Sequence, residues 1–244
     1  MKSDPTHTKM LRISYEKMLT RRFKQFIHNV IPMLKPVIKQ EQNRFYTFTT
    51  RQMEGIIDYE LYYTVENHLN IDIERYLNQG YTRGMNNAVK DIKKASHGAL
   101  VPSEYLTPLD MEAMNILRDN NVALVKNVGM DARKTIVRII NEGLLQGQGI
   151  DKIARNIRKT TTAMTINRSK IIARTEIIRS YNQASINRYK NNGIKKYQWL
   201  TAFDDRTCDD CAGLDGSMHP VDGGVRPHLH PNCRCTVIPV IGKI

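Results

Sequence analysis

The sequence predicts a mostly α-helical protein with a small β-rich C-terminal end, an α+β fold in which a helical body carries a Cys/His hairpin like a metal knuckle. Two observations lead to this prediction. Apolar residues recur at steps of three and four through most of residues 9–191, which is the period of amphipathic helices. Residues 194–200 alternate instead like a short strand, and the four cysteines follow between positions 208 and 235.

The composition is that of an ordinary globular chain. Of 244 residues, 41% are hydrophobic and 25% are charged, which excludes a wholly disordered chain and a collagen-like repeat. Charges interrupt every apolar stretch well before the roughly 18 residues of a membrane span, so we expect no membrane partner. The first residues lack an apolar signal core, and we therefore expect synthesis in the cytoplasm without secretion.

The charge of the chain is unevenly distributed. Residues 200–244 contain six acids and four bases, a net charge of −2, whereas the whole chain carries +13 and residues 1–199 therefore carry +15. A basic body favours a polyanionic partner such as nucleic acid. The alternative is a soluble basic protein whose cationic faces are merely solvated, and charge alone does not separate the two.

The N-terminal region, residues 1–100, reads as basic helices. The first begins near Lys9, and we expect Pro32 and Pro36 to kink or end it because proline lacks the backbone N–H that the helix needs. A second helix is expected over roughly 50–77, and a third after Gln79-Gly80. Residues 95–106 are the best linker candidate, so we divide the chain there into 1–100 and a C-terminal domain, 107–244.

The C-terminal domain begins with a strong helix-start signal. Thr107-Pro108-Leu109-Asp110 offers a capping residue, a proline at the first helical position and an acid in the first turn. We expect Gly129 to break this helix and Gly147-Gln148-Gly149 to turn the chain into a packed helical hairpin, which we prefer to a DNA-reading helix-turn-helix. A long helix over about 165–191 should end at Asn191-Asn192-Gly193.

Five residues in the last part of the domain, 200–244, are candidate metal ligands. Cys208 and Cys211 have the two-residue gap of a zinc knuckle, and Cys233 and Cys235 share one face if that segment is extended. Our preferred ligand set is these four cysteines, with His230 as the substitute for one of them. A site filled by protein ligands alone is closed, so we predict a structural zinc and no catalytic role. The alternatives are two disulfides or four ordinary thiols.

Three other patterns are weaker candidates for chemistry. His219 and His228 could add to an open metal site, as in a metal-dependent nuclease, but a His-Asn…His arrangement cannot be traced. Asp204-Asp205 reads as a solvated turn rather than a pair of catalytic carboxylates. Arg174-Thr175-Glu176 reads as a helical charge pair beside a half-buried threonine, without a catalytic role.

The order of motifs resembles a known family. Ile172-Ala173-Arg174-Thr175-Glu176, Asn182 and Trp199 lead to Asp205-Arg206-Thr207-Cys208 and Cys211, and His230-Pro231-Asn232-Cys233-Arg234-Cys235 closes the pattern. This arrangement resembles the C-terminal domain of the Mu F-type minor head proteins of tailed bacteriophages, over roughly residues 107–244.

The resemblance implies a non-enzymatic virion component. It implies a minor capsid protein inside the head near the portal vertex, which acts in head morphogenesis with the portal protein and contacts packaged double-stranded DNA. It also implies a role in DNA packaging or ejection, with the major capsid or scaffolding protein as further partners. Because the chain ends nine residues after Cys235, we expect no fused C-terminal effector domain. The alternatives are a metal-dependent nuclease and a DNA-binding protein unrelated to capsids.

Overall fold

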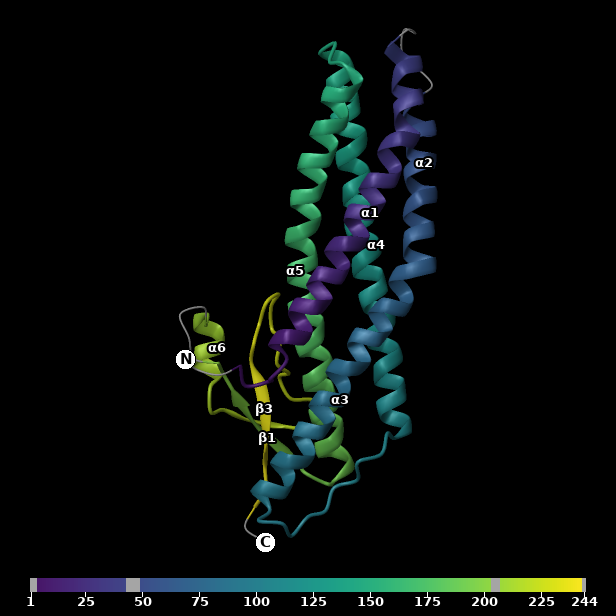
Figure 1. The fold of residues 1–244 in the computed structure, drawn as a ribbon. Coiled ribbons are helices and arrows are strands. Elements are labelled where there is room, and N and C mark those ends of the chain that lie inside the picture. Colours follow the sequence, from purple (N-terminus) through teal and green to yellow (C-terminus); the bar gives the residue numbers. More distant parts are fainter. Residues whose placement is uncertain (1–3, 43–48, 203–206, 243–244) are drawn as a thin grey trace. The chain divides into compact units, whose positions relative to one another are not determined.

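The computed structural model describes residues 4–42, 49–202 and 207–242. The predicted fold class is confirmed, because long helices make up most of the chain and a small antiparallel sheet lies near its C-terminus (Figure 1). No helix within the described residues has an apolar window that would suit a bilayer crossing. The elements are α1 (Lys9–Gln42), α2 (Thr49–Thr64), the π-helical turn η1 (Val65–Leu69), α3 (Asn70–Ala95), α4 (Pro108–Leu145), α5 (Ile150–Asn191), β1 (Lys196–Leu200), α6 (Asp209–Leu214), β2 (Met218–Pro220) and β3 (Thr236–Val240).

The chain forms two compact units, each built from segments that are far apart in the sequence. Unit 1 comprises Met1–Tyr15, Glu74–Asp119 and Ile171–Ile244, and unit 2 comprises Glu16–Ile73 and Asn120–Lys170. The predicted linker corresponds to the non-helical connection between α3 and α4, which lies inside unit 1. The division of the chain into residues 1–100 and 107–244 stays a prediction.

Unit 2 is a helical bundle in which parts of α1, α2, α4 and α5 lie alongside one another (Figure 1). Its buried side chains follow the predicted three-and-four spacing, as in the series Phe23, Phe26, Val30 and Leu34 of α1. The connection from α4 to α5 at residues 146–149 is the predicted turn, with Gly147 at φ +64°. The side chain of Ile153 packs directly against Gly143 across this turn, which is the geometry of a packed helical hairpin.

The expectation that Pro32 or Pro36 ends the first helix and that Gly129 breaks the later one was wrong. Helix α1 continues to Gln42, because both prolines lie on its exposed side, where water can satisfy the carbonyl groups that they leave unpaired. Helix α4 continues through Gly129, where the Leu61 side chain of α2 fills the space that a Cβ would occupy. The glycine therefore serves the packing of two helices and does not end one of them.

Two further boundaries also differ from those expected. The break that we expected at Gln79-Gly80 falls earlier, at the π-helical turn η1, and α3 runs through Gly80 without interruption. The hairpin's second helix and the long C-terminal helix are one element, α5, with no break at residues 159–164. Thr161 and Thr165 are buried on this helix, so its polar residues do not mark a loop.

Unit 1 packs α3 and α5 against a three-stranded sheet of order β2-β1-β3, in which both pairings are antiparallel. Helix α5 ends as predicted, with Gly193 at φ +70° and a hydrogen bond from the Ile194 N–H to the Tyr189 carbonyl. A core cluster joins the two helices to the sheet: Ala88, Ile92, Ile186, Tyr189, Ile194, Tyr197, Val221 and Val237. Helices α3 and α5 approach closely at Gly84, where a Cβ would collide with the Tyr181 backbone.

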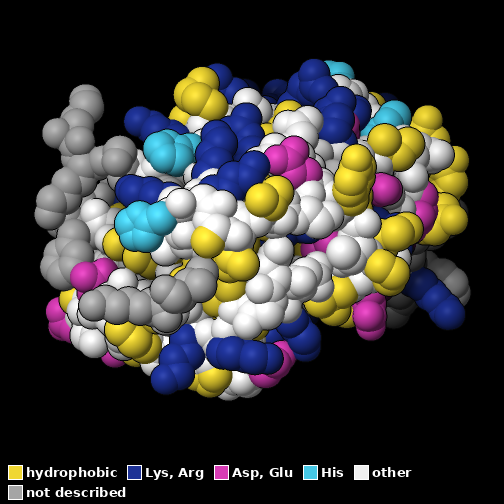
Figure 2. Space-filling model, turned by 90° about the horizontal axis from the view of Figure 1, so that it is seen from below, with side chains coloured by type: hydrophobic (Ala, Val, Ile, Leu, Met, Phe, Trp, Pro, Cys, Tyr) yellow, Lys and Arg dark blue, Asp and Glu magenta, His cyan; other side chains and the backbone are white. Residues whose placement is uncertain are grey.

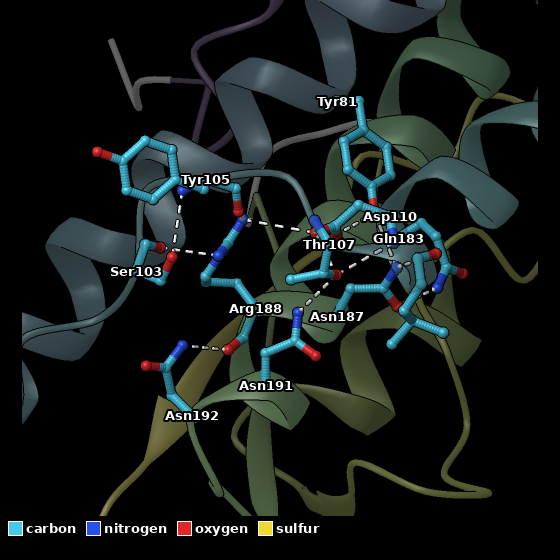
Figure 3. A network of polar contacts seen from close by, with 11 residues as sticks. Tyr81, Ser103, Tyr105, Thr107, Asp110, Gln183, Asn187, Arg188, Asn191 and Asn192 are labelled. Carbon is cyan, nitrogen blue, oxygen red and sulfur yellow. Dashed lines mark hydrogen bonds and ion pairs between the residues drawn. The ribbon is translucent and has the colours of Figure 1, made fainter.

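Within unit 1, a buried polar network holds the segment that connects α3 and α4 against helix α5 (Figure 3). The fully buried Arg188 donates to the carbonyl oxygens of Ser103 at 2.7 Å and Tyr105 at 3.0 Å, and its guanidinium lies 3.6 Å from the Asp110 carboxylate. Burial alone would raise the pKa of Asp110, but hydrogen bonds from Tyr81 and Thr107 hold that pKa below its usual range. Asp110 also accepts from the Thr107 N–H at 2.9 Å, which completes the predicted helix start.

The surface of the molecule carries its cations in groups. On the face drawn in Figure 2, Lys and Arg side chains lie beside one another in several places, with histidines next to some of these groups. Asp and Glu side chains and exposed hydrophobic residues lie among them. The excess of basic residues in the sequence therefore forms local concentrations of positive charge.

Candidate metal centre

The five predicted ligands come together within unit 1. In the structure their donor atoms form two triads, Cys208–Cys211–His230 and Cys211–Cys233–Cys235, in each of which every donor atom lies within 4.8 Å of the others. Cys211 belongs to both triads. All four cysteines are free thiols, so the two-disulfide alternative is not what the structure shows.

Short helix α6 places the first two ligands. Cys208 caps this helix, and its sulfur accepts a hydrogen bond from the Cys211 N–H at 3.5 Å. One helical turn therefore brings both sulfurs to the same side. The sulfurs of Cys208 and Cys211 each lie 3.2 Å from His230 Nε2.

The C-terminal loop places the other ligands. Asn232 has a positive φ of +65°, which turns the chain between His230 and Cys233. The Cys233 sulfur lies 3.8 Å from that of Cys211, and the Cys235 sulfur lies 3.7 Å from Thr201 Oγ1. Trp199 of β1 is fully buried and packs in one cluster with Cys211, Cys233 and Cys235. Cys211, Cys233 and Cys235 are thus buried against Trp199, whereas Cys208 and His230 are only half-buried.

The thiols differ strongly in acidity. Burial raises the pKa of Cys211 to about 12, whereas hydrogen bonding by the Cys235 thiol lowers the pKa of Cys233 to about 5. A hydrogen bond to the Pro231 carbonyl raises the pKa of His230. A bound cation stabilises several thiolates at once, and this donor set of soft sulfurs with an imidazole is the kind that zinc prefers. The cluster can therefore hold a metal ion.

Helix α5 holds the ligand-bearing loop through a row of polar side chains. Thr175 Oγ1 accepts from the Asn232 N–H at 3.0 Å. One turn further along, Arg179 Nε donates to His228 Nε2 at 2.8 Å and its NH1 group contacts the Glu176 carboxylate at 3.2 Å. Burial raises the pKa of Glu176, and Arg179 partly offsets this effect.

The same row continues to strand β3. Asn182 Nδ2 donates to the Cys235 carbonyl at 2.9 Å, and Asn182 Oδ1 accepts from Thr236 Oγ1 at 2.8 Å. The Tyr189 hydroxyl donates to the Val237 carbonyl at 3.1 Å. Sequence reasoning did not assign a role to Arg179 or to the side-chain amide of Asn182. The available signal was their spacing along α5, since Arg179 follows Thr175 by four residues and Asn182 follows Arg179 by three.

The remaining candidates lie outside both triads. His228 accepts from Arg179, and its Nδ1 contacts the Pro227 carbonyl. His219, on β2, forms a 2.8 Å hydrogen bond with Ser217 Oγ. Among the described residues the structure therefore does not bring either histidine to the metal cluster, as an open nuclease site would need. Asp204 and Asp205 lie outside the described residues.

Comparison with known proteins agrees with the motif order. Residues 134–238 match the family model described as phage Mu protein F like protein. An uncharacterized protein of Haemophilus influenzae is 24% identical over 233 residues, which cover 91% of this chain and 52% of the relative. An uncharacterized protein of Methanocaldococcus jannaschii is 25% identical over 194 residues, which cover 72% of this chain and 30% of the relative.

The chain thus spans about half of one of these curated relatives and under a third of the other. No solved structure matches the chain. The matched segment includes all of α5, strands β1 and β2, the first part of β3 and all five candidate ligands. The resemblance seen in the sequence is therefore confirmed over residues 134–238, which match the model for phage Mu protein F-like proteins.

Proposed function

We propose that this chain is a minor head protein of a tailed bacteriophage, which acts in head morphogenesis at the portal vertex. The observation that carries the proposal is the match of residues 134–238 to the phage Mu protein F-like family. That segment corresponds to a defined part of the structure, because α5 and the C-terminal sheet are joined by a continuous row of hydrogen bonds. The proposed partners are the portal protein and packaged double-stranded DNA, with the major capsid or scaffolding protein as further contacts.

The proposed metal is a structural zinc ion. In a tetrahedral site with Zn–S bonds of about 2.3 Å and Zn–N bonds of about 2.0 Å, neighbouring donor atoms lie about 3.5–3.8 Å apart. The Cys211–Cys233 separation of 3.8 Å fits this value, and the two Cys–His230 separations of 3.2 Å need only small adjustments. We favour Cys208, Cys211, His230 and Cys233 as the ligands, in place of the four cysteines preferred from the sequence. Because Cys233 lies outside the Cys208–Cys211–His230 triad, zinc binding would draw its sulfur toward these donors. Cys235, held toward Thr201, is the alternative fourth ligand.

The role of such a metal is mechanical. It joins helix α6 to the C-terminal loop, while α5 holds the same loop through Thr175, Arg179 and Asn182. With four protein ligands, no coordination position remains for a reactive water molecule. We therefore propose an assembly role without enzymatic activity, in which the metal keeps the small β-rich end fixed to α5.

Quantitative mass spectrometry of DNA-filled particles from the encoding phage or prophage tests the proposed location. A minor head protein is present in a few copies per portal ring, and it remains with the portal when particles are gently disrupted. Complete absence from particles, together with no binding to the purified portal protein, would contradict the proposal. Divalent-ion-dependent DNA cleavage that is lost in His230→Ala would favour the nuclease alternative instead.

A further inference from the structure

A basic groove lies between α1 and α5 within unit 2. It encloses about 770 Å³, and the side chains of Lys17, Arg21, Lys24 and His28 line it from α1, while Arg158 and Thr162 line it from α5. All of these residues belong to the same compact unit. The groove is thus a single structural feature, and it is separate in the sequence from the metal ligands at residues 208–235.

The cations of the groove form a regular row. Lys17, Arg21, Lys24 and His28 are all exposed and follow one another at steps of four, three and four, which places them on one face of α1. With a rise of 1.5 Å per residue, this row extends about 16 Å along the helix. That length corresponds to about five phosphates of one DNA strand at 3.4 Å per step.

These cations also lack acidic partners. No ion pair involves Lys17, Arg21, Lys24 or Arg158 in the part of the chain that is described, and Glu16 is the one acid in the groove lining. Several other cations of unit 2 do have acidic partners within the same unit: Lys35 with Asp151, Lys126 with Glu66, Arg133 with Glu54, Arg138 with Glu142 and Arg168 with Asp131. The groove therefore concentrates uncompensated positive charge in a concave surface.

We infer that this groove binds the phosphodiester backbone of nucleic acid. Its cations provide point charges for successive phosphates, and the Thr20 and Thr162 hydroxyls provide hydrogen-bond donors on either side. The described lining contains no Phe, Tyr or Trp on which bases could stack, so recognition is of the backbone and independent of sequence. The inference rests on the proposed function, since packaged DNA supplies the ligand, and it names the surface that makes the contact.

The test uses the purified full chain and a mixed-sequence 30-base-pair duplex, with fluorescence anisotropy measured from 50 to 200 mM salt. The groove variant combines Lys17→Gln, Arg21→Gln and Lys24→Gln. The matched control combines Arg51→Gln, Lys134→Gln and Lys152→Gln, which removes the same charge from exposed, unpaired positions of unit 2 outside the groove. Circular dichroism melts establish that both variants are folded.

We expect the groove variant to bind DNA about tenfold or more weakly than the unmodified chain. The plot of log K against log salt concentration should also become less steep, with the magnitude of its negative slope smaller by about three. The control should lose much less affinity. Equal losses in both variants, or no binding by the unmodified chain, would overturn the inference. Equally tight, groove-dependent binding of poly-glutamate would also overturn it, because an acidic polypeptide would then suffice.

This assay and the particle analysis can fail independently. Groove-dependent DNA binding by a chain that is absent from particles would support the groove and contradict the head role. A chain that is present in particles but does not bind DNA would contradict the groove alone.

Discussion

The side-chain amide of Asn182, on α5, forms hydrogen bonds with two consecutive residues, Cys235 and Thr236. Its Nδ2 donates to the Cys235 carbonyl at 2.9 Å, and its Oδ1 accepts from the Thr236 hydroxyl at 2.8 Å. Asn182 is 2% exposed and Thr236 is 3% exposed, so neither group can turn to water instead. One buried side chain thus links the long helix to the start of β3 and to a candidate metal ligand.

Replacing Asn182 with alanine should destabilise unit 1. The change leaves the Cys235 carbonyl and the Thr236 hydroxyl buried without their partner, which costs about 1–3 kcal/mol for each unsatisfied group. Urea unfolding of Asn182→Ala measures the loss. Gln183→Ala is the matched control, because Gln183 is half-buried and, among the described residues, its side chain hydrogen-bonds with the Asn187 and Arg226 side chains. Equal free energies of unfolding for the two variants would show that the Asn182 contacts are unimportant.

Two glycines should respond in opposite directions to alanine. Gly84→Ala places a methyl group against the Tyr181 backbone of α5, and we expect a loss of about 1–3 kcal/mol or more. Gly55 lies within α2 with nothing near the position of a Cβ, so Gly55→Ala should stabilise the protein by up to about 1 kcal/mol. Thermal unfolding of both variants compares them directly. A Gly84→Ala variant as stable as the parent would show that α3 and α5 do not pack this closely.

Ionisation of Asp91 should make the free energy of unfolding depend on pH. Burial raises the pKa of Asp91 to about 6, although Lys94, His7 and Lys90 act in the opposite direction. Between pH 4 and pH 6 the folded state therefore holds this proton more tightly than the unfolded state does, and stability decreases as the pH rises through that window. Asp91→Asn cannot lose the proton, so its stability should fall less over the same range. Parallel pH profiles for the two proteins would contradict this assignment.

Much of the fold could be predicted because hydrophobic spacing and capping residues act locally. The start of α4 at Thr107-Pro108 and the end of α5 at Gly193 follow from such signals. The wrong breaks at Pro32 and Gly129 depend on the surroundings of those residues. Pro32 faces outward, and Gly129 receives the side chain of Leu61 from a helix more than 60 positions earlier in the chain. Spacing along one segment carries no information about such a neighbour.

The candidate metal centre was predicted as a set of residues but not as a geometry. The spacings of the Cys and His residues identified the five ligands, and the structure brings them together as two triads that share Cys211. The sequence did not show which four belong together, because the positive φ of Asn232 and the contact from Thr175 set the path of the loop. The groove between α1 and α5 was also not predicted, since it joins faces of two helices more than 130 positions apart.

The metal content of the purified full chain tests the central claim most directly. Native mass spectrometry of protein that was produced with zinc should show one zinc ion per chain, and Cys211→Ser should remove it, because this cysteine belongs to both triads. His219→Gln lies outside the triads and should keep the ion. His230→Ala should weaken zinc binding more than Cys235→Ser does. A parent chain without metal whose stability does not change when zinc is added, or a Cys211→Ser variant that retains the ion, would contradict the metal centre.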